Sequence, residues 1–376
     1  MLDPRHATLF LVLLVGCAPP QPTTYVTYNA GLAVGFVPAA NERAPGTSEA
    51  VAALDADVVC LQEYWEPEHI ALIDAAAADA FPDRLFPDPA PEVLPAPACL
   101  PTEADPDVND IDALVTCIDE SCGDACGDDL PDCVLSECAL EFLGLEKDCL
   151  RCVQANVSDT PQGIRETCTT EATEYVYGGS FGTGILSSLP MTPHDPLLLS
   201  STTTRRSLLH AVVEAPEGDV DVFCTHLTAV FSLIPYPREE GSWAEEQAAQ
   251  VTAMRDFIAA EAVSDRVVLL GDMNAGPPVR ANEEEQLANW EALAEGWEVP
   301  FVDIDQRCTF CPDNALSSVD SDARGRLIDH VMFQGFEGRT KTPDRVLDDA
   351  FGTESCGAPI AGAYSDHYGV SVTVEP

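Results

Sequence analysis

The chain has 376 residues, 46% of them hydrophobic, which is enough for one large or two ordinary globular domains. Its 18 lysines and arginines stand against 64 aspartates and glutamates, which gives a formal net charge of −46. Such a chain repels polyanions at long range and lacks the basic surface expected of a nucleic-acid-binding protein, although a bound divalent cation would still permit chemistry on phosphate groups.

The N-terminus has the features of an export signal. Residues 7–16 form an apolar run that is too short to span a bilayer and suits the core of a signal peptide. This run leads to Cys17 in a Leu-Val-Gly-Cys sequence that resembles the processing box of bacterial lipoproteins. We therefore predict a signal peptide at residues 1–16 and a tether lipidated on Cys17 at residues 17–22, with a plain secretory signal as the alternative. Both interpretations place the protein outside the cytoplasm, as a membrane-anchored lipoprotein or a secreted protein.

Strands and helices alternate in the next part of the chain. A strand over residues 25–28 precedes a helix over residues 46–56, and a strand over residues 57–62 precedes a helix over residues 67–80. Seven prolines between residues 82 and 101 then predict a stiff connector with little regular structure.

An acidic, cysteine-rich segment follows. Residues 99–174 contain 19 acids against 3 bases, and nine of the 15 cysteines. Apolar residues recur there at helical spacing, at Ile111, Leu114, Val115, Ile118 and at Val134, Cys138, Phe142, Leu145. We predict that the connector and this segment, residues 82–174, are a disulfide-rich acidic helical insert in an α/β core. The insert could serve as a rigid cap on the core, or it could control access of the substrate.

Cysteine usage is consistent with an oxidising compartment. Cys60 and Cys224 lie within apolar strands and are interpreted as small core residues. Without these two and Cys17, twelve cysteines remain, and nine of them belong to the insert. Because nine is odd, complete oxidation requires at least one disulfide from the insert to the rest of the chain.

The other three cysteines lie near the C-terminus. Cys308-x-x-Cys311 could close a tight local loop, which would leave Cys356 as the partner of the insert. Zinc is the alternative, since Cys149-x-x-Cys152 and Cys308-x-x-Cys311 have the spacing of zinc ligands. The predicted compartment favours disulfides.

The core resumes near residue 174. A glycine-rich loop at residues 178–184 matches no phosphate-binding loop and is predicted to be a tight turn between antiparallel strands. Neighbouring strands at residues 207–214 and 220–225 indicate mixed or antiparallel sheets. Ser242 begins a capping box and therefore a helix, and a further helix is predicted over residues 283–295.

Polar residues stand at the ends of the apolar strands. The run Val267-Val268-Leu269-Leu270 leads through Gly271 to Asp272 and Asn274. Other strand ends carry Asn29, Glu63, His226, Asp329 with His330, and Asp366 with His367. Acids, amides and histidines at the ends of many strands predict one shared site.

These motifs resemble, in order and rough spacing, those of the endonuclease/exonuclease/phosphatase superfamily, which includes deoxyribonuclease-I-like nucleases and neutral sphingomyelinases. The motifs are Tyr28-Asn29, Leu61-Gln62-Glu63, Thr225-His226-Leu227, Gly271-Asp272-Met273-Asn274, Ile328-Asp329-His330 and Ser365-Asp366-His367. The resemblance covers residues 24–375 apart from the insert, so we assign residues 23–81 and 175–376 to a catalytic domain. It implies a four-layer sandwich, in which two packed mixed β-sheets are flanked by helices.

The resemblance also implies a metal site for Mg²⁺, with Mn²⁺ as a possible substitute. Glu63 corresponds to the principal ligand, with Asn29 beside it, and Asp366 corresponds to a contributor to a second or shifted metal position. Carboxylate oxygens are the hard ligands that Mg²⁺ prefers.

Five further residues are expected to act on the phosphate ester. His367 resembles the catalytic histidine, either a base or a charge on the phosphate, oriented by Asp329. Asp272 resembles the residue that orients or deprotonates the attacking water, and Asn274 a donor to the phosphate. His226 resembles the second histidine, which stabilises the pentacoordinate phosphorus or assists the leaving group.

Two positions depart from the family pattern. His330 stands where many relatives carry an aromatic residue, and we expect it to serve packing. Ser188 stands where relatives often carry a basic residue, which weakens the case for a polyanionic substrate.

Three functions remain open at this stage. The first is a Mg²⁺-dependent phosphodiesterase that acts on lipid head groups, as sphingomyelinases do, which the tether, the acidity, Tyr64-Trp65-Glu66 and the apolar loop at residues 230–234 favour. The second is an extracytoplasmic nuclease, for which the arginines are few and scattered. The third is a catalytically silent binding lipoprotein. A phosphomonoesterase would follow if neither lipid nor DNA were cleaved, and no protein partner is implied.

Overall fold

The computed structural model describes residues 21–125, 130–216, 218–232, 234–317 and 323–376. The predicted signal peptide, Cys17 and most of the predicted tether lie outside these residues, as does Cys126 of the insert. Within the described part of the chain, no helix combines the length and the apolar character needed to cross a membrane.

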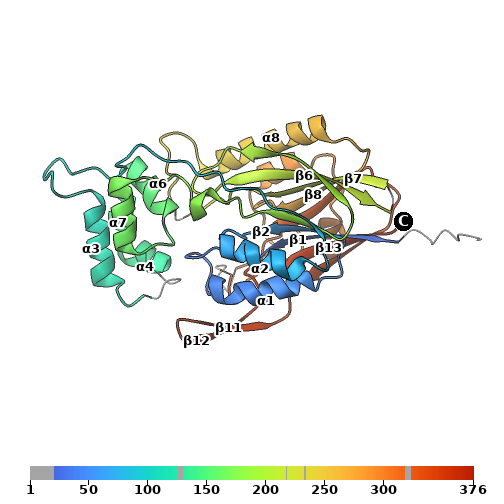
Figure 1. The fold of residues 1–376 in the computed structure, drawn as a ribbon, viewed down its shortest axis with the longest axis horizontal. Helices are drawn as coiled ribbons and strands as arrows, with labels where there is room; N and C mark the ends of the chain where they lie inside the picture. Colours follow the sequence, from blue (N-terminus) through green and yellow to red (C-terminus); the bar gives the residue numbers. More distant parts are fainter. Residues whose placement is uncertain (1–20, 126–129, 217, 233, 318–322) are drawn as a thin grey trace, which may run out of the picture.

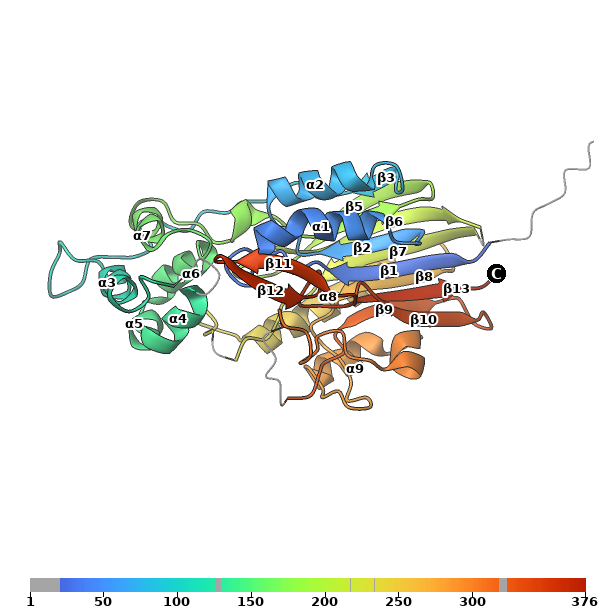
Figure 2. The same cartoon turned by 90° about the horizontal axis from the view of Figure 1, so that it is seen from below.

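Two mixed β-sheets pack face to face (Figures 1 and 2). The first sheet has the order β10 (Lys341–Val346), β13 (Gly369–Val374), β1 (Thr23–Asn29), β2 (Val58–Gln62), β4 (Gly184–Ser187), β3 (Asp83–Leu85). The second has the order β5 (Met191–Leu199), β6 (Arg206–Ala215), β7 (Gly218–His226), β8 (Val267–Asp272), β9 (Asp329–Gln334). β1 pairs with β2, and β7 with β8, in parallel, and the other neighbours are antiparallel.

The sheets bury an apolar core between them, because alternate residues of their inner strands are Val, Ile, Leu and Phe. Helices cover the two outer faces. α1 (Ala40–Ala52) and α2 (Pro67–Ala77) pack on the first sheet, and α8 (Trp243–Glu261) and α9 (Leu287–Ala294) pack on the second. The predicted four-layer sandwich is therefore confirmed.

The insert forms a helical cluster at the end of the sandwich that lies opposite the C-terminus (Figure 1). Its helices are α3 (Ile111–Ser121), α4 (Leu130–Glu137), α5 (Ala139–Leu143), α6 (Lys147–Ala155) and α7 (Pro161–Thr170). They enclose a separate small core that contains the predicted apolar stripes. α6 holds this cluster against the sandwich, since Lys147 donates to the Tyr236 carbonyl at 3.0 Å and Gln154 accepts from Thr203 at 3.1 Å.

Disulfides are present, as predicted, but not all where the sequence analysis placed them. The insert contains Cys99–Cys149, Cys117–Cys138, Cys122–Cys133 and Cys152–Cys168, and Cys308–Cys311 closes the predicted local loop. Cys356, in the hairpin of β11 (Phe351–Ser355) and β12 (Ala358–Gly362), is disulfide-bonded as well. The interpretation of Cys60 and Cys224 as free core residues is wrong, because they form a buried disulfide between β2 and β7. Inner faces that are packed this closely bring two cysteines of opposite sheets within bonding distance, which a strand pattern does not reveal.

Other differences concern element boundaries. α1 begins at Ala40, with Pro45 inside it, rather than at residue 46, and α9 is shorter than predicted. The glycine-rich loop is not a turn between antiparallel strands, because the segment before it forms only an isolated bridge at Tyr175 and a short 3₁₀ turn. The proline-rich connector begins with β3, an edge strand paired to β4. Ser242 is the N-cap of α8, as predicted, since its hydroxyl accepts from the Glu245 amide at 3.2 Å.

The Cys60–Cys224 disulfide generates a prediction about stability. It joins residues 164 positions apart, so its loss should release a long loop in the unfolded chain. We expect Cys60→Ala/Cys224→Ala to lower the free energy of unfolding by about 2–5 kcal/mol in urea titrations. The matched variant Cys122→Ala/Cys133→Ala, whose loop spans 11 positions, should lose less. An unchanged free energy for the first variant would contradict the prediction.

Candidate active site

The predicted site residues converge because of the way the strands are paired. Parallel β1 and β2 bring Asn29 next to Gln62 and Glu63, and parallel β7 and β8 place His226 opposite Asp272. Antiparallel β9 starts at Asp329 opposite Asp272, and β13 begins just after His367. Since β13 runs to the C-terminus, the residues before it lie at the end of the sandwich that faces the insert (Figure 1).

Asp272 lies at the centre of the site and is almost fully buried. Its Oδ2 accepts from Asn29 Nδ2 at 2.9 Å and lies 3.4 Å from His226 Nε2 and 3.9 Å from His367 Nε2. Its Oδ1 accepts from the backbone amide of Asn274 at 2.8 Å. Burial, followed by the charge of Asp329, raises the pKa of Asp272 from 3.8 to about 7.

His367 and Asp329 form the predicted pair. His367 Nδ1 and Asp329 Oδ2 are 2.9 Å apart, and both side chains are buried. Burial lowers the pKa of His367, but the carboxylates of Asp329, Asp366 and Asp272 outweigh this effect and hold the pKa well above 6.5. His367 is therefore an imidazolium at neutral pH, and its Nε2 lies on the side of the ring that is near the Asp272 carboxylate.

The pKa of His226 is shifted in the opposite direction from that of His367. Burial, the Arg206 guanidinium and the His367 charge hold its pKa well below 6.5, so the ring is neutral. Its Nε2 lies 3.2 Å from Asn274 Nδ2, which also donates to the Leu227 carbonyl at 3.0 Å. The site thus pairs one charged with one neutral imidazole, an arrangement in which the two rings take different roles in proton transfer.

Glu63 and Asp366 make the site electronegative. Glu63 has a left-handed backbone, with φ 62°, and its Oε1 accepts from Asn29 Nδ2 at 3.2 Å. Burial and the charge of Asp366 raise the pKa of Glu63. Gly31 lets Asp366 approach, because a side chain there would collide with the Asp366 carboxylate and the Ser365 hydroxyl.

The donor set fits a divalent metal ion. Glu63 Oε2 and Asp329 Oδ1 are buried oxygens without a hydrogen-bond partner in the described structure. Asp272 and Asp329 each offer a carboxylate oxygen within 4.8 Å of the other, whereas His367, as an imidazolium, offers no free lone pair. Neighbouring carboxylates with unused oxygens are the hard ligands that Mg²⁺ binds. The side-chain amide of Asn29 donates from Nδ2 to both Glu63 and Asp272, and its oxygen accepts a hydrogen bond from the backbone amide of Gly31. All eight predicted residues are therefore linked in one network of contacts and charges.

Arg206 and Trp65 were not predicted as site residues, although they line the same site. Arg206 begins β6 and is buried, and its guanidinium lies 5.5 Å from the Trp65 ring and interacts electrostatically with Glu63 and Asp272. Its Nε and Nη1, Trp65 Nε1 and His226 Nδ1 are buried and have no hydrogen-bond partner among the residues that the structure describes. Burial lowers the pKa of Arg206 to about 10, so it stays charged at neutral pH. The sequence feature that could have pointed to Arg206 is its place at the start of a mainly apolar strand.

His330 has the packing role that was expected. Its Nε2 pairs with the Ala275 carbonyl at 3.0 Å, and its ring stacks on Trp290 at 4.2 Å between centroids. Its ring therefore packs against α9, the helix that carries Trp290.

With the geometry established, comparison with known proteins identifies the family. A model of the endonuclease/exonuclease/phosphatase family matches residues 26–367. The chain belongs to this family. A search of curated protein sequences found no match.

Solved structures share the fold at low sequence identity. SmcL has a TM-score of 0.56 at 12% identity, and the match covers 95% of this chain and all of that one. Sphingomyelinase C from Streptomyces griseocarneus has a TM-score of 0.54 at 15% identity, and the match covers 94% of this chain and all of that one. A beta toxin variant from Staphylococcus aureus with bound magnesium ions has a TM-score of 0.55 at 11% identity, with the same coverage. These likenesses establish the fold.

The charge of the site generates a prediction about metal binding. Because the pKa of Asp272 is raised to about 7, ionisation of this carboxyl should cost the metal-free protein stability as pH rises from about 4 to 7, and a cation should offset this cost. We expect saturating Mg²⁺ to raise the melting temperature by about 5 °C at pH 8 and by less at pH 5. Differential scanning fluorimetry should show the shift reduced in Glu63→Gln and retained in the exposed control Glu68→Gln. A shift of equal size at both pH values would contradict the assignment.

Proposed function

We propose that this protein is a metal-dependent phosphodiesterase of the sphingomyelinase type, which hydrolyses the phosphodiester of lipid head groups. The proposal rests on groups that converge at one end of the sandwich. They are buried carboxylates with unused oxygens, a charged and a neutral imidazole, and Arg206, whose Nε and Nη1 have no hydrogen-bond partner among the described residues. These are the groups that cleavage of a phosphate ester requires.

Glu63 and Asp366 would hold the metal ion, with Asn29 fixing Glu63 and Asp272. When bound, Mg²⁺ supplies charge neutralisation at the phosphoryl oxygens. Mn²⁺ is expected to substitute, since it accepts the same carboxylate ligands.

The remaining residues divide the chemistry of water attack and phosphate binding. Asp272 accepts a hydrogen bond from the attacking water and takes its proton, because a carboxyl with a pKa of about 7 is a suitable base near neutral pH. The Nε2–H of His367, held by Asp329, faces the same carboxylate and places a positive charge next to the phosphoryl group. Arg206 and Trp65 Nε1, whose N–H groups have no partner in the described structure, would donate to the phosphoryl oxygens. Asn274 is expected to add a donor to the phosphate, and His226 to assist the leaving oxygen.

Several features support a lipid substrate over DNA. Arg205 and Arg238 are ion-paired with Glu92 and Glu174, so their charges are already neutralised within the described structure instead of being free to bind a polyanion. Phe36 and Phe231, on the loops after β1 and β7, are each 40% exposed and offer apolar contact. The structures that the chain resembles include a sphingomyelinase C.

The proposed location is outside the cytoplasm. Several disulfides, buried in both the insert and the sandwich, indicate folding in an oxidising compartment. We further propose that Cys17 carries a lipid that anchors the chain to a membrane, where its substrate would be concentrated.

Hydrolysis itself is the first test. Purified protein with Mg²⁺ should release phosphocholine from sphingomyelin vesicles, and Glu63→Gln and His367→Gln should each lower kcat by at least about 10³-fold, since each removes a group that acts on the phosphate. Glu68→Gln and His194→Gln, on exposed residues, are the matched controls and should retain activity. Nicking of plasmid DNA without release of phosphocholine would favour the nuclease, and activity on neither would contradict a phosphodiesterase.

Arg206 provides a second test with a built-in control. We expect Arg206→Met to lower kcat/KM by about 10²-fold, because it removes a buried charge and its donors from the phosphate. The adjacent Arg205→Met removes a guanidinium that is paired with Glu92 and should leave kcat/KM unchanged. Equal effects of the two substitutions on initial rates would show that Arg206 has no special role.

A further inference from the structure

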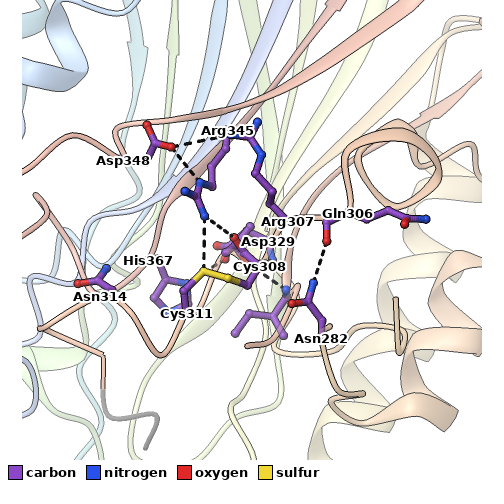
Figure 3. The surroundings of a disulfide bond; sticks show 12 residues. Asn282, Gln306, Arg307, Cys308, Cys311, Asn314, Asp329, Arg345, Asp348 and His367 are labelled. Carbon is purple, nitrogen blue, oxygen red and sulfur yellow. Dashed lines mark hydrogen bonds and ion pairs between the residues drawn. A yellow bond between two sulfur atoms is a disulfide. The ribbon is translucent and has the colours of Figure 1, made fainter. Parts of the chain in front are cut away.

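A disulfide-closed segment lies against the catalytic pair. Cys308 and Cys311 are joined, and the four residues 308–311 run beside His367 and Asp329 (Figure 3). Cys311 is fully buried, and Cys308 packs against Gly325, where any side chain would meet its sulfur. The segment belongs to no helix or long strand, so its shape depends on the disulfide and on a few specific contacts.

Thr309 holds both members of the catalytic pair through the backbone. Its hydroxyl accepts from the backbone amides of Ile328 and Asp329 at 3.1 and 3.2 Å. Its carbonyl accepts from the Tyr368 amide at 2.9 Å, next to His367. Thr309 is fully buried, so these contacts have no competition from water.

Phe310 contacts the imidazole itself. Its ring centroid lies 4.9 Å from that of His367, at an interplanar angle of 41°, and its backbone forms a bridge to His367. The backbone of Phe310 is also bonded in both directions to Arg326, at 3.0 and 2.8 Å. An aromatic ring held in this manner blocks rotation of the imidazole out of line with Asp329.

The turn that follows Cys311 supports His367 from the other side. Asn314 bonds its amide to the Cys311 carbonyl at 3.2 Å, and its side chain donates to the Ser365 carbonyl at 2.8 Å. The Ser365 hydroxyl in turn accepts from the His367 amide at 3.0 Å. Cys311 and Tyr368 share a small apolar cluster, which Arg345 covers from outside.

We propose that the Cys308–Cys311 disulfide is a positioning element for catalysis, which holds Thr309 and Phe310 against Asp329 and His367 so that the imidazole stays aligned. The proposal rests on the proposed function, because it assigns a role within the same site. A disulfide that closes so short a loop removes little entropy from the unfolded chain, so its main effect should be local order rather than global stability.

The test compares two disulfides. We expect Cys308→Ala/Cys311→Ala to lower kcat by about 10- to 100-fold with little change in KM, because a small misplacement of a catalytic group has effects of this size. The control Cys122→Ala/Cys133→Ala, in the insert, should retain kcat. If the first variant keeps kcat within about twofold, or if KM rises instead, the proposal is wrong.

Two side-chain variants test the same idea without touching the disulfide. Phe310→Ala should reproduce the fall in kcat, and Phe310→Tyr, which keeps the ring, should restore it. Thr309→Val should lower kcat and Thr309→Ser, which keeps the hydroxyl, should restore it. Equal kcat values for alanine and tyrosine at 310 would contradict a positioning role for the ring.

A spectroscopic measurement separates this inference from the proposed function. The proton on His367 Nδ1 should give a low-field NMR resonance, assigned by its absence in His367→Gln, that shifts or broadens in Cys308→Ala/Cys311→Ala and not in the control. Because this signal reports the bond to Asp329 and needs no turnover, it tests the positioning role even if the wild-type protein cleaves none of the substrates. An unmoved resonance would overturn the positioning role, whereas a moved resonance without wild-type activity would overturn the proposed function alone.

Discussion

The structure depends on holding several negatively charged carboxylates close together in a buried site. Glu63, Asp272, Asp329 and Asp366 are gathered at one end of the sandwich, where burial and mutual repulsion raise the pKa of Glu63 and Asp272. Buried carboxylates are tolerated only with compensating donors or cations. Asn29, His367 and Arg206 supply part of this compensation, and we propose that a bound ion at the unused oxygens supplies the rest.

A rigid scaffold is needed to hold groups that repel one another. The register of the parallel pairs fixes Asn29 beside Glu63 and His226 beside Asp272. The loop after β1 is held by the buried Arg43, which donates to the carbonyls of Ala30, Pro38 and Tyr364 and so joins this loop to the segment that carries Asp366. Function thus depends on backbone contacts that themselves contain no catalytic group.

The sequence predicted the sandwich and the convergence of the eight residues, because apolar strands that end in acids, amides and histidines can be recognised from local sequence alone. Sequence-based prediction failed for features that depend on contacts between distant parts of the chain. The partnership of Cys60 with Cys224 requires the packing of two sheets, and the role of Arg206 depends on burial beside Trp65. The helix predicted over residues 46–56 begins at Ala40, because the fold accommodates Pro45 inside the first turns of α1.

The position of the Cys60–Cys224 bond has a consequence for cleavage of the chain by proteases. The whole insert and its exposed connector lie between the two joined cysteines in the sequence. A cut anywhere in that stretch would therefore leave the strand that leads to Glu63 covalently attached to the strand that carries His226. After cleavage within the insert, the sandwich would therefore remain one molecule made of two chains joined by this disulfide.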